Sequence, residues 1–191
     1  MSTAPQPGVG NNAIRIRRAL ASDVNAIRDL ERAAGVVFAT VGLDQIAADD
    51  PPSAATLTDA VASGHVLVAL AEPVPSTATE EQIVGWALWE PDGPTAHLEQ
   101  VSVHPDWSGR RIGRRLITAV DAAAAATGAQ ALTLTTFRDV VWNAPLYRRY
   151  GFVDLPESDW GPALQQRWLD EQAAGLDVAP RIAMMRPINT L

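Results

Sequence analysis

The chain has 191 residues, of which 47% are hydrophobic and 19% are charged, a composition typical of one globular domain with its own core. It contains no cysteine, so disulfides, thiolate metal ligands and a cysteine nucleophile are excluded. The formal net charge of −7 argues against a nucleic-acid partner, because phosphate backbones require a basic surface. The sequence shows no signal peptide and no apolar run of about 20 residues, which predicts a cytoplasmic protein with no membrane partner.

Hydrophobic patterns predict a mixed α/β chain. Residues 1–12 are expected to form a disordered N-terminal tail, and residues 13–191 a single domain. The expected loops are 35–42, which begins and ends with a glycine, and 72–81, which carries two prolines and few hydrophobic residues. The expected strands are 13–18, 65–71, 82–89, 97–103, 131–137, 153–155 and 181–187, and the expected helices are 24–34, 56–63, 112–127 and 161–174.

The stretch 97–152 organises the rest of the chain. It begins with a strand-like run over 97–103, and a short polar turn then leads into a helix that starts near Ile112. A second strand over 131–137 follows almost at once. Strand, helix and strand in this order form a βαβ unit, so the two strands are expected to be parallel.

Four arginines crowd the first turn of this central helix: Arg110, Arg111, Arg114 and Arg115. Free N–H groups already give a helix N-terminus partial positive charge, so exposed cations there cost about 0.3–1 kcal/mol each. Positive charge gathered against the helix dipole suggests an anion as ligand, most naturally a phosphate. An ordinary solvated basic turn is the alternative, and the turn alone does not decide between the two.

Two segments together resemble the GNAT superfamily of N-acetyltransferases, whose acetyl-CoA pyrophosphate loop reads Gln/Arg-x-x-Gly-x-Gly/Ala. On this chain the loop covers 108–113, where Ser108 replaces the Gln/Arg, Arg111 replaces the first glycine, and Gly113 fits the pattern. Downstream, 143–152 (NAPLYRRYGF) resembles the family's asparagine followed by Tyr-x-x-x-Gly-Phe. The two segments occur in the expected order and at the expected spacing.

The resemblance implies a GNAT fold, in which a mixed central sheet of about six to seven strands is flanked by helices around a βαβ unit that binds acetyl-CoA. It also implies an acyl-CoA-dependent N-acyltransferase. Such an enzyme moves an acetyl group from acetyl-CoA directly to a primary amine of a small molecule, or to an exposed peptide or protein amine, in a ternary complex. No metal is expected, and a homodimer stays open.

The same resemblance implies that acetyl-CoA is bound by the end of the central strand, by the loop and by the downstream asparagine. Asn143 could equally cap the following helix with its side chain, and the two roles are compatible. The expected cofactor residues are Val101, Ser102, Val103, Ser108, Gly109, Arg110, Arg111, Ile112, Gly113, Arg114 and Asn143.

Tyr147 matches the family tyrosine that can protonate the leaving CoA thiolate, and a tyrosine that only packs is the alternative. An aliphatic amine has a pKa of about 10.4 and arrives protonated, so a base must take its proton. His97 and Glu99 lie where superfamily members place this base, and the two-residue period predicts that they share one face with Val101 and Val103. Glu99 is the first candidate, with His97 as a second or as a relay, and a GNAT with no side-chain base is the alternative.

The acceptor side is the part that the sequence defines least. By analogy with the GNAT fold, Glu31 and Phe38 are candidates for the acceptor-binding wall. Trp142 is a third candidate, because it stands next to Asn143 and aromatic walls suit organic cations. An ordinary surface or packing role is more common for each of these residues. A second class of function, a non-catalytic CoA-binding sensor that keeps the fold, also stays open. The presence of Tyr147 together with His97 and Glu99 favours the enzyme.

Overall fold

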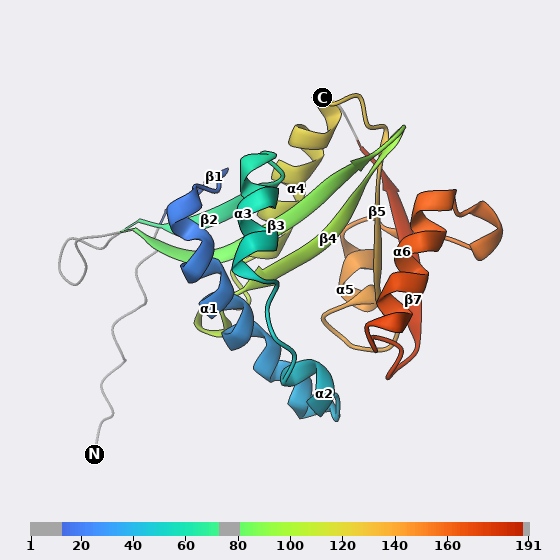
Figure 1. Ribbon diagram of the computed structural model, residues 1–191, viewed down its shortest axis with the longest axis horizontal. Coiled ribbons are helices and arrows are strands. Elements are labelled where there is room, and N and C mark those ends of the chain that lie inside the picture. Colours follow the sequence, from blue (N-terminus) through green and yellow to red (C-terminus); the bar gives the residue numbers. More distant parts are fainter. Residues whose placement is uncertain (1–12, 73–80, 189–191) are drawn as a thin grey trace, which may run out of the picture.

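The centre of the computed structural model is a seven-stranded mixed sheet in the order β1-β2-β3-β4-β5-β7-β6 (Figure 1). The structure describes residues 13–72 and 81–188, so the predicted tail and most of the predicted loop 72–81 lie outside the described residues. The predicted mixed sheet of six to seven strands is confirmed. Its strands are β1 (Ile14–Arg18), β2 (Val66–Ala71), β3 (Gln82–Asp92), β4 (Thr95–Val103), β5 (Ala131–Phe137), β6 (Val153–Asp154) and β7 (Arg181–Pro187).

The helices differ from prediction where they are short. The segment 35–42, predicted as a loop, holds the 3-10 helix η2 (Val36–Val41), which ends at Gly42 in the left-handed conformation. Helices α2 and α5 have four and six residues, too few to show a hydrophobic period. The α-helices are α1 (Val24–Gly35), α2 (Asp44–Ala47), α3 (Ala54–Ala62), α4 (Ile112–Ala125), α5 (Ala144–Arg149) and α6 (Pro162–Ala173), and the other 3-10 helices are η1 (Ala21–Asp23), η3 (Pro105–Trp107) and η4 (Glu157–Asp159).

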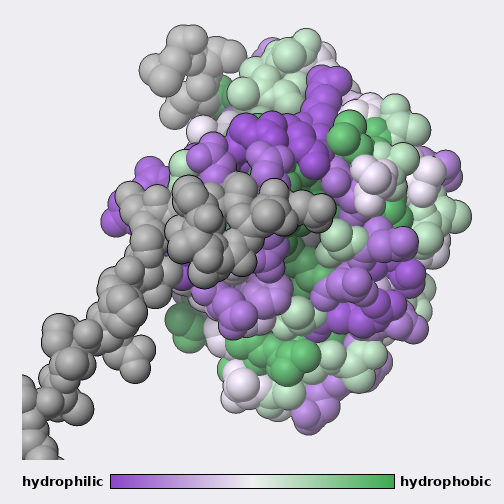
Figure 2. Space-filling view, turned by 90° about the vertical axis from the view of Figure 1, so that its left-hand side faces the viewer, coloured by the Kyte–Doolittle hydropathy of each residue, from purple (hydrophilic) through white to green (hydrophobic). Residues whose placement is uncertain are grey.

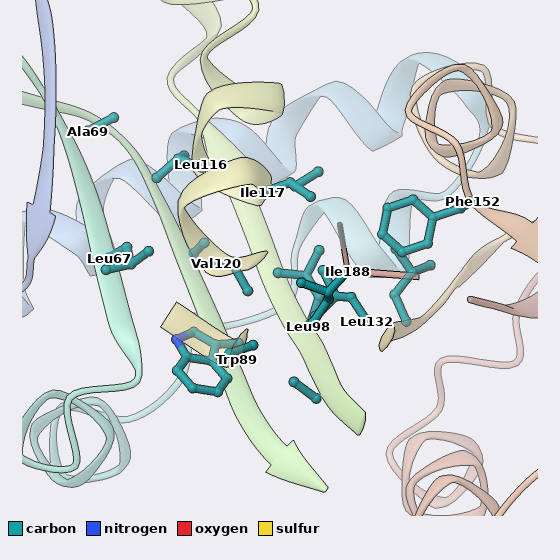
Figure 3. Close-up of a cluster of buried hydrophobic side chains, with 14 of the residues drawn as sticks. Leu67, Ala69, Trp89, Leu98, Leu116, Ile117, Val120, Leu132, Phe152 and Ile188 are labelled. Carbon is teal, nitrogen blue, oxygen red and sulfur yellow. The ribbon is translucent and has the colours of Figure 1, made fainter. Parts of the chain in front are cut away.

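Two hydrophobic clusters cover the two faces of the sheet. On one face, here called the α4 face, the apolar stripe of α4 packs on the strands together with Leu98 and Phe152 (Figure 3). The other, here called the α1 face, is covered by α1 and α3, whose Ile27 and Leu57 pack against Trp86 of β3. Among the described residues, no helix has the length and hydropathy that crossing a bilayer requires.

Strands β4 and β5 meet only briefly. They pair in parallel, as predicted, and the pairs are Thr95 with Ala131, Ala96 with Leu132, and His97 with Thr133. Beyond these pairs β4 continues for six residues and β5 for four, and within the described residues the two strands make no further pairs. They diverge as a V that opens toward their C-terminal ends (Figure 1).

A β-bulge in β4 lies just where the V begins. Leu98 pairs with Trp89 of β3, whereas Gln100 pairs with Leu88, so Glu99 is an extra residue with no partner across the ladder. An extra residue reverses the alternation of side chains along a strand. Leu98 therefore packs on the α4 face, and Gln100 points to the α1 face, where its side chain reaches α1.

The bulge overturns one expectation from the sequence. Val101 and Val103 pack in the cluster on the α4 face. His97 neighbours Leu98 and so points to the opposite face, and there Glu99 forms an ion pair with Arg167 of α6. The prediction that His97, Glu99, Val101 and Val103 share one face is wrong, because a uniform two-residue period does not hold across a bulge.

Candidate active site

The backbone of β4 presents free hydrogen-bonding groups to the open V. The N–H of His104 donates to the carbonyl oxygen of Val84 in β3 at 2.9 Å. Successive strand residues turn their N–H and C=O groups to opposite sides, so those of Val103 and Val101 point away from β3 and into the V. Of the expected cofactor residues on this strand, these two can bind a ligand through the backbone, whereas the backbone of Ser102 faces β3.

The turn before α4 is shaped by two residues with positive φ. Gly109 has φ of 75° and Arg111 has φ of 60°, and no other described residue except glycine has a positive φ. Arg111 occupies the position of the family's first glycine, so the structure shows why that position favours glycine. No side chain caps α4, and helix geometry leaves the N–H groups of its first residues, Ile112, Gly113 and Arg114, without intrahelical acceptors.

The four arginines of this turn are exposed, and within the described residues none of them forms an ion pair with a carboxylate. The Arg110 guanidinium lies 4.4 Å from the centre of the Trp107 ring, and Arg115 donates to the carbonyl oxygen of Ile14. The expected loop residues thus come together at one helix N-terminus, with free N–H groups and unneutralised positive charge. This set of donors fits the pyrophosphate of CoA.

Tyr147 lies on the α4 face, in α5. Its ring packs edge to face with Phe152, with centroids 5.7 Å apart, so Tyr147 does have the packing contact that the alternative role predicts. Burial, with a smaller contribution from Tyr150, raises the pKa of the Tyr147 phenol above its ordinary value, so the hydroxyl keeps its proton at neutral pH. No described residue hydrogen-bonds to that hydroxyl, which leaves it available as a donor.

Asn143 precedes α5 and ties it to the end of β5. Its side-chain Nδ2 donates to Thr136 Oγ1 at 2.8 Å. Its backbone carbonyl, rather than its side chain, accepts from the N–H groups of Leu146 and Tyr147 at 2.8 and 2.9 Å. The expected side-chain cap is therefore absent, and contact with the CoA arm stays a prediction.

His97 is buried on the other face, with 1% of its surface exposed. Its Nδ1 lies 2.9 Å from Thr133 Oγ1. Burial, assisted by the positive charges of Arg167 and Arg181, lowers the pKa of His97 to about 3. The imidazole is therefore neutral at pH 7 and a weak base.

Glu99 belongs to a network of charges around α6. Arg167 pairs with Glu99 and donates to Glu90 Oε2 of β3 at 2.6 Å. One turn further along α6, Glu171 pairs with Arg181 at 2.7 Å. Sequence reasoning missed these partners, although residues 167 and 171 have the i, i+4 spacing that places two side chains on one helix face.

Glu31 of α1 has a different environment. One carboxylate oxygen accepts from Trp86 Nε1 at 2.7 Å and the other from Gln100 Nε2 at 2.6 Å. Burial raises the pKa of Glu31, although hydrogen bonds from Ser102, Trp86 and Gln100 oppose the shift. The structure thus connects this candidate acceptor residue to β4 at the level of Ser102, beside the V.

Phe38 and Trp142, the other two acceptor candidates, are in contact. Their ring centroids are 5.8 Å apart, edge to face, and Phe38 makes a second contact of the same length with Phe137 at the end of β5. Phe137 was missed by the sequence reasoning, because its strand position indicated only core packing. No described residues form a group of three or more His, Asp and Glu side chains that could hold a metal ion.

Comparison with known proteins identifies the class. Residues 62–154, which include β4, the basic turn, α4, β5 and α5, match the model of the acetyltransferase (GNAT) domain. Rv2747 from Mycobacterium tuberculosis, in complex with CoA, has a similar fold, with a TM-score of 0.66 at 19% identity over 92% of this chain and 99% of that chain.

Two further structures have the same fold at low identity. The PaiA N-acetyltransferase of Thermoplasma acidophilum, in complex with coenzyme A, gives a TM-score of 0.66 at 15% identity over 92% of this chain and 99% of its own. The ribosomal-protein-S18-alanine N-acetyltransferase of Escherichia coli gives 0.60 at 16% identity over 94% and 96%. Residues 62–154 therefore form a GNAT acetyltransferase domain, and the predicted fold and class, an acyl-CoA-dependent N-acyltransferase, are confirmed.

Proposed function

We propose that this enzyme transfers the acetyl group of acetyl-CoA to a primary amine of a small molecule, by direct attack in a ternary complex. The V between β4 and β5 carries this proposal. It joins a free backbone edge at Val101 and Val103 to the basic N-terminus of α4. If the pantetheine arm of acetyl-CoA is bound in the V and its phosphates at the N-terminus of α4, the thioester would lie between the α4 face and the α1 face of the sheet.

The side chains of the two faces support separate proton transfers. On the α4 face, the protonated Tyr147 phenol can donate to the sulfur as the C–S bond breaks. On the α1 face, Glu99 is our first candidate to take the proton of the ammonium, so that the neutral nitrogen can attack the carbonyl carbon. His97 is the weaker base because its pKa is about 3. Backbone N–H groups of β4 can stabilise the oxyanion. The products are an acetamide, the CoA thiol and one proton.

Three further aspects of the proposal concern the molecule as a whole. We propose that residues 13–191 act as one domain, that the protein works in the cytoplasm, and that no nucleic acid takes part. The net charge of −7 supports the last point. Peptide or protein amines remain the alternative acceptors, a monomer and a homodimer are both compatible with the described residues, and the reaction is proposed without a metal.

The test is the release of CoA thiol from acetyl-CoA in the presence of a panel of primary amines. Because the chain has no cysteine, a thiol reagent reports CoA with no background from the protein. We expect release that depends on both the amine and the enzyme, and calorimetric binding of acetyl-CoA. If the protein binds acetyl-CoA but releases no CoA thiol with any small amine or peptide, the non-catalytic sensor is supported instead.

A further inference from the structure

The carboxylate of Glu31 has no cationic partner among the described residues. Its hydrogen-bond donors are the indole of Trp86, the amide of Gln100 and the hydroxyl of Ser102, all of them uncharged. Glu31 is half-buried, and a carboxylate that leaves water without a countercharge is costly, so such groups are usually paired. Glu99, on the same face, has its arginine. A cation supplied by a ligand would complete the environment of Glu31.

The segment that carries Glu31 crosses the mouth of the V. Glu31 is bonded to Gln100 of β4, whereas Phe38, seven residues later, contacts Phe137 at the end of β5. Seven residues of helix correspond to about 10 Å along the axis. The segment 31–38 therefore links the two diverging strands, with the carboxylate beside β4 and the aromatic side chains beside the end of β5.

The aromatic side of this opening contains an unused donor. The Nε1 atom of Trp142 is buried and has no hydrogen-bond acceptor among the described residues. Buried indole N–H groups usually have a partner. The ring of Trp142 contacts Phe38 of η2, and the same short helix exposes Val36, Val37 and Val41. Figure 2 shows hydrophobic surface at the lower end of the molecule, the end at which α2 lies in Figure 1.

We propose that the acceptor is a primary amine on an aromatic skeleton that carries a carbonyl oxygen. Its ammonium pairs with Glu31, its ring packs against Phe38 and Phe137, and its carbonyl accepts from Trp142 Nε1. This inference rests on the proposed function, because it names the substrate of the same site. Phenylalanine amide has all three features, 2-phenylethylamine lacks the carbonyl, and ethanolamine lacks both the ring and the carbonyl.

The experiment measures kcat/KM for these three amines, together with their binding to the enzyme–CoA complex by calorimetry. For the wild type we expect phenylalanine amide to exceed 2-phenylethylamine by about 10-fold, the value of one hydrogen bond, and ethanolamine by about 100-fold or more. Glu31→Gln should raise KM for both aromatic amines by about 10- to 100-fold, because a charge-assisted contact is lost. Acetyl-CoA binding should not change.

Two substitutions distinguish recognition of the acceptor's aromatic ring from recognition of its carbonyl oxygen. Trp142→Phe keeps an aromatic ring and removes the N–H, so it should abolish the preference for phenylalanine amide over 2-phenylethylamine and leave the second amine unaffected. Phe38→Ala should reduce the preference for aromatic over aliphatic amines by about 10-fold or more. Trp168→Phe is the matched control, because that indole packs on Trp160 instead and should change neither preference.

The outcomes distinguish this inference from the proposed function. Efficient acetylation of ethanolamine, with no preference for the aromatic amines, would overturn the assigned site and leave the transferase reaction intact. Binding of phenylalanine amide that depends on Glu31, without CoA release, would support the site and contradict the reaction. Variants at Glu31 and Phe38 that bind acetyl-CoA normally but show unchanged KM for every amine would also overturn the assignment.

Discussion

The arginines at the two ends of the site have opposite environments. At the start of α4, Arg110, Arg111 and Arg114 are exposed and have no carboxylate partner within the described residues. Around α6, Arg167 and Arg181 are largely buried and each is paired with at least one glutamate. The first group can attract an anion, whereas the second is already neutralised and mainly fixes the carboxylates that surround it.

This difference teaches how one small enzyme can separate two substrates of opposite charge. On the acceptor side, three glutamates (Glu90, Glu99 and Glu171) share two guanidinium groups in ion pairs, and Glu31 forms no ion pair within the described residues. In the proposed function, this difference would draw the phosphates of CoA to the helix N-terminus and a cationic amine to the other face of the sheet. The predictions below test whether the two ends act separately.

The largest effect on activity is expected at Tyr147, beside the proposed position of the thioester between the cofactor end and the acceptor end. Tyr147→Phe removes the hydroxyl and keeps the ring contact with Phe152, so folding and acetyl-CoA affinity should be nearly unchanged. Loss of a positioned acid should lower kcat by about 10²–10⁴-fold if this proton transfer limits the rate. Steady-state kinetics check it, with Tyr150→Phe as the control. Wild-type turnover in Tyr147→Phe would leave this tyrosine with a packing role only.

Gly113→Glu tests the anion-binding end alone. It places bulk and negative charge beside the free N–H groups of α4, and we expect acetyl-CoA affinity to fall by at least about 100-fold. Gly113→Ala is the matched control, because its added Cβ would meet only Val103 Cγ2, at an ordinary 3.8 Å. Calorimetry measures both variants. Unchanged affinity in a folded Gly113→Glu protein would remove this turn from the cofactor site.

Glu99→Gln and His97→Gln test the acceptor side. We expect Glu99→Gln to lower turnover at pH 7 by about 100-fold, and His97→Gln to have a much smaller effect, because an imidazole of pKa about 3 is a weak base. The Glu99 defect should shrink at high pH, where more of the amine is neutral. Measured pH–rate profiles decide between them, and the roles are reversed if His97→Gln shows the larger defect and the alkaline rescue.

The buried histidine also makes stability depend on pH. Between pH 6.5 and about 3, the unfolded chain binds a proton at His97 that the folded protein excludes, so the free energy of unfolding falls as the pH is lowered. From pH 7 to pH 5 the loss should be about 2 kcal/mol. Urea unfolding of the wild type and of His97→Gln measures it. The variant should lose most of this slope, and an unchanged slope would contradict the buried neutral imidazole.

The smallest effect concerns Arg111. Its left-handed conformation costs about 1–2 kcal/mol, and a glycine would remove that cost. Because glycine also has more conformational entropy in the unfolded chain, the net gain in the free energy of unfolding for Arg111→Gly should be about 0.5–1 kcal/mol. The same change should weaken acetyl-CoA binding by about 2- to 5-fold, because an exposed charge near phosphates is lost. Arg111→Ala is the control. It should lose the same affinity without gaining stability.

The cofactor end could be predicted from the sequence because it is nearly contiguous. The basic turn and Tyr147 lie within 40 residues, and the βαβ order determines how they come together. The acceptor side depends on contacts between residues far apart in the sequence, such as Phe38 and Phe137, and no local sequence pattern predicts such contacts. The bulge at Glu99 was also invisible, because a single unpaired residue changes the face of its neighbours and leaves the hydrophobic pattern readable in either register.

From the short junction between β4 and β5 we expect the lifetime of the protein to depend on the supply of acetyl-CoA. Only three residue pairs join the two halves of the sheet along these strands, so an arm bound in the V would act as a missing strand between them. A ligand that binds only the folded state stabilises it by about 2.7 kcal/mol at a concentration 100 times its Kd. When acetyl-CoA is abundant, we expect fewer excursions to opened forms and slower digestion by proteases. When it is scarce, the same chain should be degraded sooner, so that the amount of enzyme follows the supply of its acetyl donor.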